Sequence, residues 1–165
     1  MSVSTVYGIK NDKTIDEIGE VRNGMAACLP IWRTLHEKYI GGQMNTFVPK
    51  MEVWGLEPTE TTPEEYMTLL ASFDGYFVKK EDIDAVRDLL EKAIENGMAK
   101  HTRIEMLDIM KAHPEYDRYF ITATSAGDYS EFFIPEYDEF DDVEEVWISD
   151  DVWDLYDSYK TDMEN

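Results

Sequence analysis

Apolar residues recur at two spacings along this chain, and the spacings predict where strands and helices lie. Residues 2–9 alternate β-branched and aromatic residues with others, which is typical of a short strand. Four more segments have the composition of strands: residues 46–54, 119–123, 130–134 and 143–148. Pro49 cannot donate to a sheet ladder, so we expect the first of the four at a sheet edge or a bulge. Gly127-Asp128 separates the next two and predicts a β-hairpin.

The first helix is predicted to begin near residue 14. Thr14 and Glu17 have the spacing of a capping box, in which each side chain bonds the backbone amide of the other residue. Apolar residues then follow at steps of three and four: Ile18, Val21, Met25, Cys28, Trp32, Leu35 and Tyr39. Pro30 interrupts this stripe, so we expect a kink or two helices broken within residues 23–30. Gly41-Gly42 ends the segment.

Two further helices have clear boundaries. Thr62-Pro63-Glu64-Glu65 combines an N-cap threonine, a proline at the first helical position and a capping-box glutamate. This motif predicts a short helix to about residue 72. Residues 81–96 carry one apolar face, and Gly97 follows as a helix terminator.

The C-terminal half adds two more helices. Thr102 and Glu105 form another capping box, and the helix that they begin must end before Pro114. A last helix, capped by Ser149 or Asp150, is expected to run to about residue 160. Together the elements predict one α+β domain over residues 1–165, with a small antiparallel sheet, helices packed on one face and a strongly acidic C-terminal third.

Charge is distributed unevenly along the chain. The formal net charge is −21, and residues 128–165 hold fifteen acidic side chains against one basic one, Lys160. Nine aromatic residues are interspersed with these acids: Tyr129, Phe132, Phe133, Tyr137, Phe140, Trp147, Trp153, Tyr156 and Tyr159. A segment this rich in aromatics can bury area, so we expect a folded anionic surface rather than a featureless tail. Such a surface attracts basic partners, and nucleic-acid-binding grooves are the commonest extended basic surfaces.

Two sets of carboxylates in this region are candidate partner-binding residues. On a helix of 100° per residue, Asp150, Asp154 and Asp157 fall on one stripe, and Trp153 lies at the border between that stripe and the core. The second set is a run of seven acids: Glu136, Asp138, Glu139, Asp141, Asp142, Glu144 and Glu145. Both sets space negative charges at a few ångströms, as phosphates are spaced in a duplex. A solvated helix face and a divalent-cation site are the alternatives for the first set, and a mobile acidic loop is the alternative for the second.

Other chemistry finds little support in the residue pattern. The acidic run has no glycine and so lacks the EF-hand pattern, and one cysteine with three separated histidines cannot build a structural zinc site. Each histidine is expected at the surface, and Cys28 is expected in the core. Nucleophile-elbow, P-loop and dinucleotide-binding motifs are missing. We therefore expect no enzyme, no cofactor and no metal, and we expect a cytoplasmic protein that contacts neither membrane nor nucleic acid directly.

Two families offer resemblances of different kinds. In size, net charge and aromatic-rich acidity, the chain resembles phage and mobile-element inhibitors of restriction or CRISPR nucleases, which implies a nucleic-acid mimic that inhibits a basic protein. Leu29-Pro30-Ile31-Trp32 through Tyr39-Ile40-Gly41-Gly42 is similar to the LP…L…GG opening of the SUKH immunity family, which implies neutralisation of one cognate toxin. Residues 81–134 also fit the element order of a winged-helix DNA binder, but acids on the expected recognition helix and wing oppose that interpretation.

Overall fold

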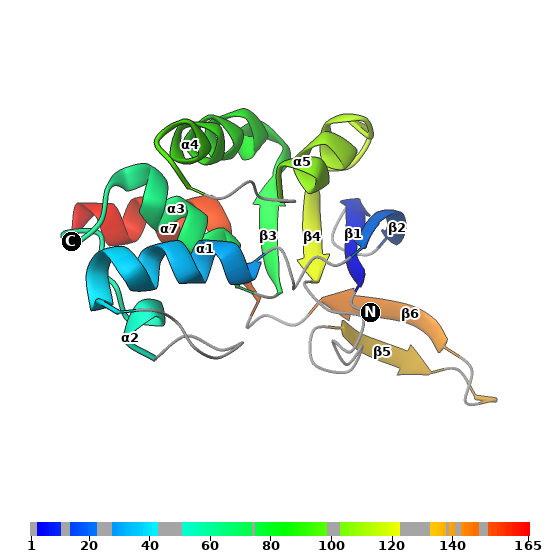
Figure 1. Ribbon diagram of the computed structural model, residues 1–165. Helices are drawn as coiled ribbons and strands as arrows, with labels where there is room; N and C mark the ends of the chain where they lie inside the picture. The colour runs from blue at the N-terminus through cyan, green and yellow to red at the C-terminus, as the bar shows by residue number, and fades with distance from the viewer. Residues whose placement is uncertain are drawn as a thin grey trace.

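A five-stranded mixed sheet organises the α+β fold (Figure 1). This computed structural model describes residues 3–10, 14–22, 28–42, 51–73, 75–98, 103–122, 133–137, 139–140, 143–148 and 152–165. The sheet has the strand order β2-β1-β4-β3-β7, and β5 and β6 form a separate two-stranded sheet. The strands are β1 (Val3–Lys10), β2 (Thr14–Arg22), β3 (Tyr76–Lys79), β4 (Arg118–Thr122), β5 (Phe133–Tyr137), β6 (Val143–Ile148) and β7 (Trp153–Asp154). Only β3 and β7 pair in parallel, so the predicted antiparallel sheet is mixed at one edge.

Six α-helices accompany these strands in the described part of the chain. They are α1 (Cys28–Leu35), α2 (Met51–Trp54), α3 (Pro63–Ala71), α4 (Ile83–Glu95), α5 (Arg103–Lys111) and α7 (Leu155–Glu164). A π-helical turn, His36–Ile40, extends α1, and a 3₁₀ turn, Lys80–Asp82, precedes α4. The predicted boundaries of α3, α4 and α5 are confirmed, including the Thr62 capping box and positive φ at Gly97.

The main core lies on one face of the sheet. Alternation along β4 directs Tyr119 and Ile121 into this core and Phe120 to the opposite face. Helices α3, α4, α5 and α7 each contribute buried residues to the same core as Tyr119 and Ile121. No described helix contributes to the smaller cluster around Phe120. The prediction of helices on one face is therefore confirmed.

Helix α3 is buried on every side. Its inner face packs on the sheet, and Leu69 on its outer face joins a second apolar cluster with α1, α2 and α4. Residues 64–71 are all buried as a result. Polar side chains in this stretch, Glu64 and Glu65 among them, must therefore find partners inside the protein.

The predicted helix at residues 14–22 is wrong, because this segment is strand β2. The register with β1 shifts between Val6 and Tyr7, so that Ile18 is an extra residue on β2. Such a bulge interrupts the two-residue alternation of a strand. Ile15 consequently packs on one face of the sheet and Val21 on the other, and the bulge produces the three-residue spacing that imitates a helix.

Four further predictions change. Pro30 lies in the first turn of α1, where proline is tolerated, and the helix starts within the predicted break. Residues 51–54 are helical rather than extended, while residues 43–50 lie outside the described part. Strand β4 pairs with β1 and β3, and β5 pairs with β6, so among the described residues the predicted hairpin of β4 with β5 is wrong. The last helix begins at Leu155 rather than near residue 150.

Candidate functional site

The junction between β7 and α7 carries three of the predicted partner-binding residues. Asp154 is the N-cap of α7, and its Oδ1 accepts a hydrogen bond of 2.9 Å from the backbone amide of Asp157. Trp153 is half-buried, with its ring centroid 5.1 Å from that of Tyr76, and packs against the main core. The predicted helical stripe of Asp150, Asp154 and Asp157 is wrong, because α7 starts at Leu155 and Asp154 precedes it.

Asp82 joins this junction from the turn before α4. Carboxylate oxygens of Asp82, Asp154 and Asp157 all lie within 4.8 Å of one another, and we call these three residues the Asp82 cluster. Lys79 Nζ lies 2.5 Å from Oδ2 of Asp157, and Lys160 Nζ lies 3.5 Å from its Oδ1. Three carboxylates at this spacing could ligate a divalent cation, but two lysine ammonium groups already neutralise one of them.

The three carboxylates of the Asp82 cluster differ in pKa because their surroundings differ. The hydrogen bond from Lys79 holds the pKa of Asp157 below its ordinary value. Burial raises the pKa of Asp154, and burial together with the adjacent Glu81 carboxylate raises the pKa of Asp82. The Asp82 cluster therefore combines one readily ionised acid with two that resist ionisation.

Three acids of the run, Glu136, Glu144 and Glu145, lie on the β5–β6 pair, which projects away from the helices (Figure 1). Glu136 and Glu145 are register partners, and the register shifts after Glu136, which leaves Glu144 as the extra residue. In the turn between the strands, Glu139 is exposed and Phe140 is 75% exposed. Asp138, Asp141, Asp142 and Asp150 lie outside the described residues. Among the described residues of this region, the most exposed large apolar side chain is thus an aromatic next to an exposed acid.

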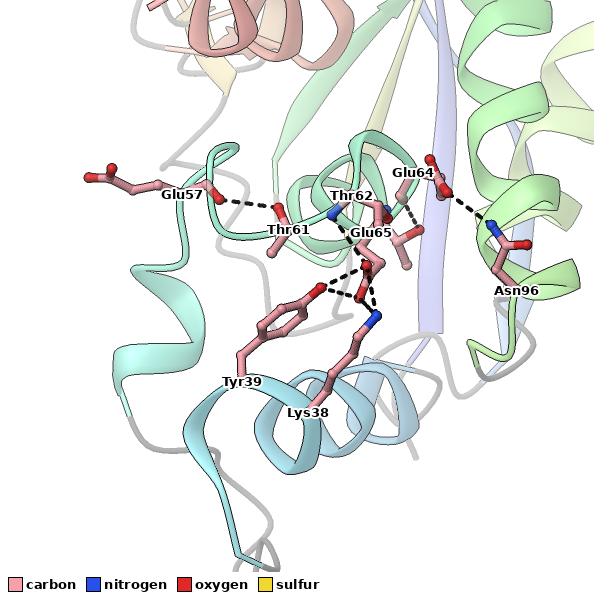
Figure 2. A network of polar contacts seen from close by, with 9 residues as sticks. Lys38, Tyr39, Glu57, Thr61, Thr62, Glu64, Glu65 and Asn96 are labelled. Carbon is pink, nitrogen blue, oxygen red and sulfur yellow. Dashed lines mark hydrogen bonds and ion pairs between the residues drawn. The ribbon is translucent and has the colours of Figure 1, made fainter.

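A second group of acids, which the sequence analysis missed, lies at the start of α3 (Figure 2). The carboxylate of Glu65 accepts two hydrogen bonds of 3.1 Å from Lys38 Nζ. The Tyr39 hydroxyl donates to the same carboxylate, 2.8 Å from Oε1 and 2.9 Å from Oε2, and the Thr62 amide lies 3.2 Å from Oε1. Glu65 thus joins the turn after α1 to the N-terminus of α3, as Figure 2 shows.

These contacts set the acidity of the group. Burial by itself raises the pKa of Glu65, but hydrogen bonds from Thr62, Tyr39 and Lys38 outweigh it and lower the pKa. The hydrogen bond with Glu65 also raises the pKa of Lys38. The pair is therefore fully ionised at neutral pH.

Glu64 points away from Glu65, toward the C-terminal end of α4 (Figure 2). Its Oε1 accepts a hydrogen bond of 2.9 Å from Asn96 Nδ2. Its Oε2 lies 4.0 Å from Lys92 Nζ. The burial of both glutamates could have been predicted from the sequence. Five of the residues at positions 66–71 are apolar, which indicates a helix buried on all sides, and such a helix also buries its first turn.

The two described histidines show no catalytic arrangement among the described residues, and the side chain of Cys28 lies outside them. His36 is buried, contrary to prediction, and its Nδ1 lies 3.2 Å from the carbonyl oxygen of Gly42. His113 is half-buried, with Nδ1 2.8 Å from the carbonyl oxygen of Ile109. Cys28 opens α1, and His101 lies outside the described part. Each described histidine therefore bonds a nearby backbone carbonyl.

Comparisons with protein-family models, with curated proteins and with solved structures found no match. Across the described residues, none of the helices combines the length and apolarity needed to cross a bilayer. Any function must accordingly be argued from the arrangement of the chain's own side chains.

Proposed function

We propose that this chain is a non-catalytic binding protein that docks its acidic C-terminal third onto a basic surface of another protein, of the kind that binds nucleic acid. The observation that carries the proposal is Phe140, which is 75% exposed beside exposed Glu139 in a region with fifteen acids and one base. Buried aromatic anchors supply much of the affinity of protein interfaces, and charge complementarity supplies encounter rate and specificity.

The internal ion pairs of the chain support this proposal. Six basic residues have a side-chain nitrogen within 4.0 Å of an acidic side chain in the described part: Lys38, Lys79, Arg87, Lys92, Lys111 and Lys160. Arg103 is 1% exposed and bonds the carbonyl oxygen of Ala71. The excess of 36 acids over 15 bases therefore needs cations from outside the chain. A basic partner provides these cations and relieves the repulsion between the acidic side chains of the surface.

Competition with DNA tests the proposal. The protein is added to complexes of labelled duplex DNA with several unrelated basic DNA-binding proteins, and equally basic proteins that bind no nucleic acid are tested for direct binding as a control. We expect displacement of the DNA from more than one complex, weakening as salt rises, and little binding to the control proteins. Absence of displacement, or equal affinity for both groups of proteins, would refute a nucleic-acid mimic.

Phe140→Ala tests the anchor within the same assay. We expect affinity to fall by about tenfold or more, as for an interface hot spot. Met163→Ala is the matched control, because Met163 is the other exposed large apolar residue in the described part of the chain, at 38%, and lies on α7 rather than on the β5–β6 turn. Tight binding to one toxin without displacement of DNA elsewhere would instead favour an immunity protein.

A further inference from the structure

A polar cavity of about 340 Å³ lies between the start of α3, the turn after α1 and the end of α4. Its lining includes Thr34, Lys38, Thr62, Glu64, Asn96 and Met98. Ligand pockets commonly begin at about 300 Å³, so a small molecule fits this space. The cavity lies apart from the Asp82 cluster and from the β5–β6 turn, and none of their residues lines it.

Glu64 gives the cavity a partly compensated negative charge. Its side chain is 7% exposed, and one oxygen, Oε1, accepts from Asn96. The other oxygen has Lys92 Nζ at 4.0 Å, which is beyond hydrogen-bond distance, and the Lys92 side chain is 63% exposed. A buried carboxylate without a cation in direct contact gains stability from any cation that reaches it.

The neighbouring groups decide what charge a ligand should carry. Lys38, the other ionised group on the cavity wall besides the glutamates, already makes two hydrogen bonds to Glu65. The cavity also adjoins the C-terminal end of α4 at Asn96, and helix C-termini carry partial negative charge. Thr34 and Thr62 line the same space, and a threonine hydroxyl oxygen can accept two hydrogen bonds. Glu65 offsets both Lys38 and the partial positive charge at the N-terminus of α3, so Glu64 and the end of α4 are the charges left to act on a ligand, and they favour a cationic hydrogen-bond donor.

We infer that this cavity binds a small organic cation through a primary ammonium group. The ammonium donates to Oε2 of Glu64 and to the threonine hydroxyls, and the alkyl part of the ligand lies toward Met98, which is 7% exposed. This site is independent of the proposed docking surface, because it uses a different part of the molecule.

Titration with n-butylamine at physiological ionic strength tests the site, with n-butanol as the neutral molecule of similar shape. Binding is followed by NMR through the amide signals of Asn96, Gly97 and Met98. We expect saturable shifts with the amine and none with the alcohol. In Glu64→Gln, affinity should fall by about tenfold, because a charge-assisted hydrogen bond is lost.

Two further variants separate the cavity from general attraction to an acidic protein. Glu95→Gln removes an exposed charge from the same end of α4 and should bind the amine as the wild type does. Equal weakening in Glu64→Gln and Glu95→Gln, or shifts spread over the whole acidic surface, would overturn the inference. Thr34→Met keeps every charge but fills the cavity, so it should also lose binding. Wild-type affinity in Thr34→Met would overturn the inference even if Glu64→Gln failed to fold.

Discussion

Lys79 Nζ on β3 lies 2.5 Å from Oδ2 of Asp157 on α7, so one acid of the proposed docking surface already has a cation within its own chain. Both side chains remain accessible, at 39% and 46%. Ion pairs with this exposure contribute about 0–1 kcal/mol, and a strongly basic partner can exchange them. Asp157 therefore links α7 to the sheet in the free protein. At Asp154, one turn earlier, burial and the neighbouring acids outweigh the hydrogen bond that its carboxylate accepts from the Asp157 amide.

Replacing each of these acids by asparagine should shift stability in opposite directions. Asp154→Asn keeps a good N-cap and removes a charge that burial disfavours, so we expect a gain of about 0.5 kcal/mol at pH 7. Because the pKa of Asp154 is raised in the folded state, the wild type becomes more stable as pH falls through that pKa. The advantage of Asp154→Asn over the wild type should therefore disappear in acid. Urea unfolding of both proteins across the acid range measures the difference.

Asp157→Asn should lose stability, by at most about 1 kcal/mol at pH 7, because the contacts with Lys79 and Lys160 disappear. The pKa of Asp157 is lowered, so its contribution is present above the ordinary aspartate pKa and is lost as pH falls through the folded-state value. The deficit should therefore shrink in acid and in high salt. A stabilised Asp157→Asn would show that the lysine contacts are absent in solution.

Glu65→Gln should destabilise the protein by about 1–3 kcal/mol at pH 7, because it leaves Lys38 and Tyr39 without their charged acceptor. The lowered pKa of Glu65 confines its contribution to pH values above the ordinary glutamate pKa, and acid removes it as pH falls through the folded-state value. The two unfolding curves should thus approach each other at low pH. Glu91→Gln, which breaks a surface i,i+4 pair with Arg87, should cost about 0.5 kcal/mol or less.

Gly8→Ala should destabilise the sheet by about 1–3 kcal/mol through overpacking. A Cβ atom at Gly8 would lie 2.5 Å from the ring of Tyr116, near the base of the side chain, where the ring cannot swing away. The hydrogen bond to Asp16 raises the pKa of Tyr116 to about 12, and a displaced ring should titrate near the ordinary value of about 10. Chemical denaturation and NMR titration of Tyr116 measure the two effects.

A double-mutant cycle identifies the ring as the obstacle. In a Tyr116→Ala background, Gly8→Ala should cost much less than in the wild type, because the space above Gly8 is then open. Equal costs in both backgrounds would assign the effect to the backbone of β1 instead.

Trp153→Ala and Phe140→Ala should separate folding from binding. Trp153 packs on Tyr76 and the main core, so its truncation should cost about 2–4 kcal/mol of stability. Phe140 is 75% exposed, so its truncation should change stability by less than about 0.5 kcal/mol while weakening partner binding. Thermal melts and affinities on the same two variants measure both quantities. A large loss of stability in Phe140→Ala would remove it from the docking surface.

Helices with local signals were predictable from the sequence, and elements defined by distant partners were not. Thr62, Gly97 and Pro114 act through backbone groups within a few residues, so α3, α4 and α5 could be predicted with their boundaries. Strand β3 has four residues, too few to show a period, and it is a strand because β4 and β7 flank it. Ile18 has the spacing of a helix residue although it lies on a strand, because a bulge changes the spacing of apolar strand residues.

The candidate sites show the same division. Asp154 and Asp157 could be singled out by charge, but Asp82, which precedes Asp154 by 72 residues and Asp157 by 75, reaches them by folding alone. Glu65 was assigned correctly to a capping box, yet its bonds to Lys38 and Tyr39 depend on α1 packing over α3. Local chemistry thus predicted the roles of single residues, and only tertiary packing determined which of them meet.

Strand β4 is the only link between β1 and β3 in the main sheet, and its residues pair with β1 positions more than one hundred residues earlier. Chains dominated by such distant pairings fold slowly, because a long loop must close before the contacts form. On a ribosome, β1 and β2 would emerge as an isolated hairpin, which is at best marginally stable in water. The helices α3 and α4, whose contacts are local, are therefore expected to collapse first during synthesis, with the sheet assembling against them only after residues 118–122 have left the exit tunnel.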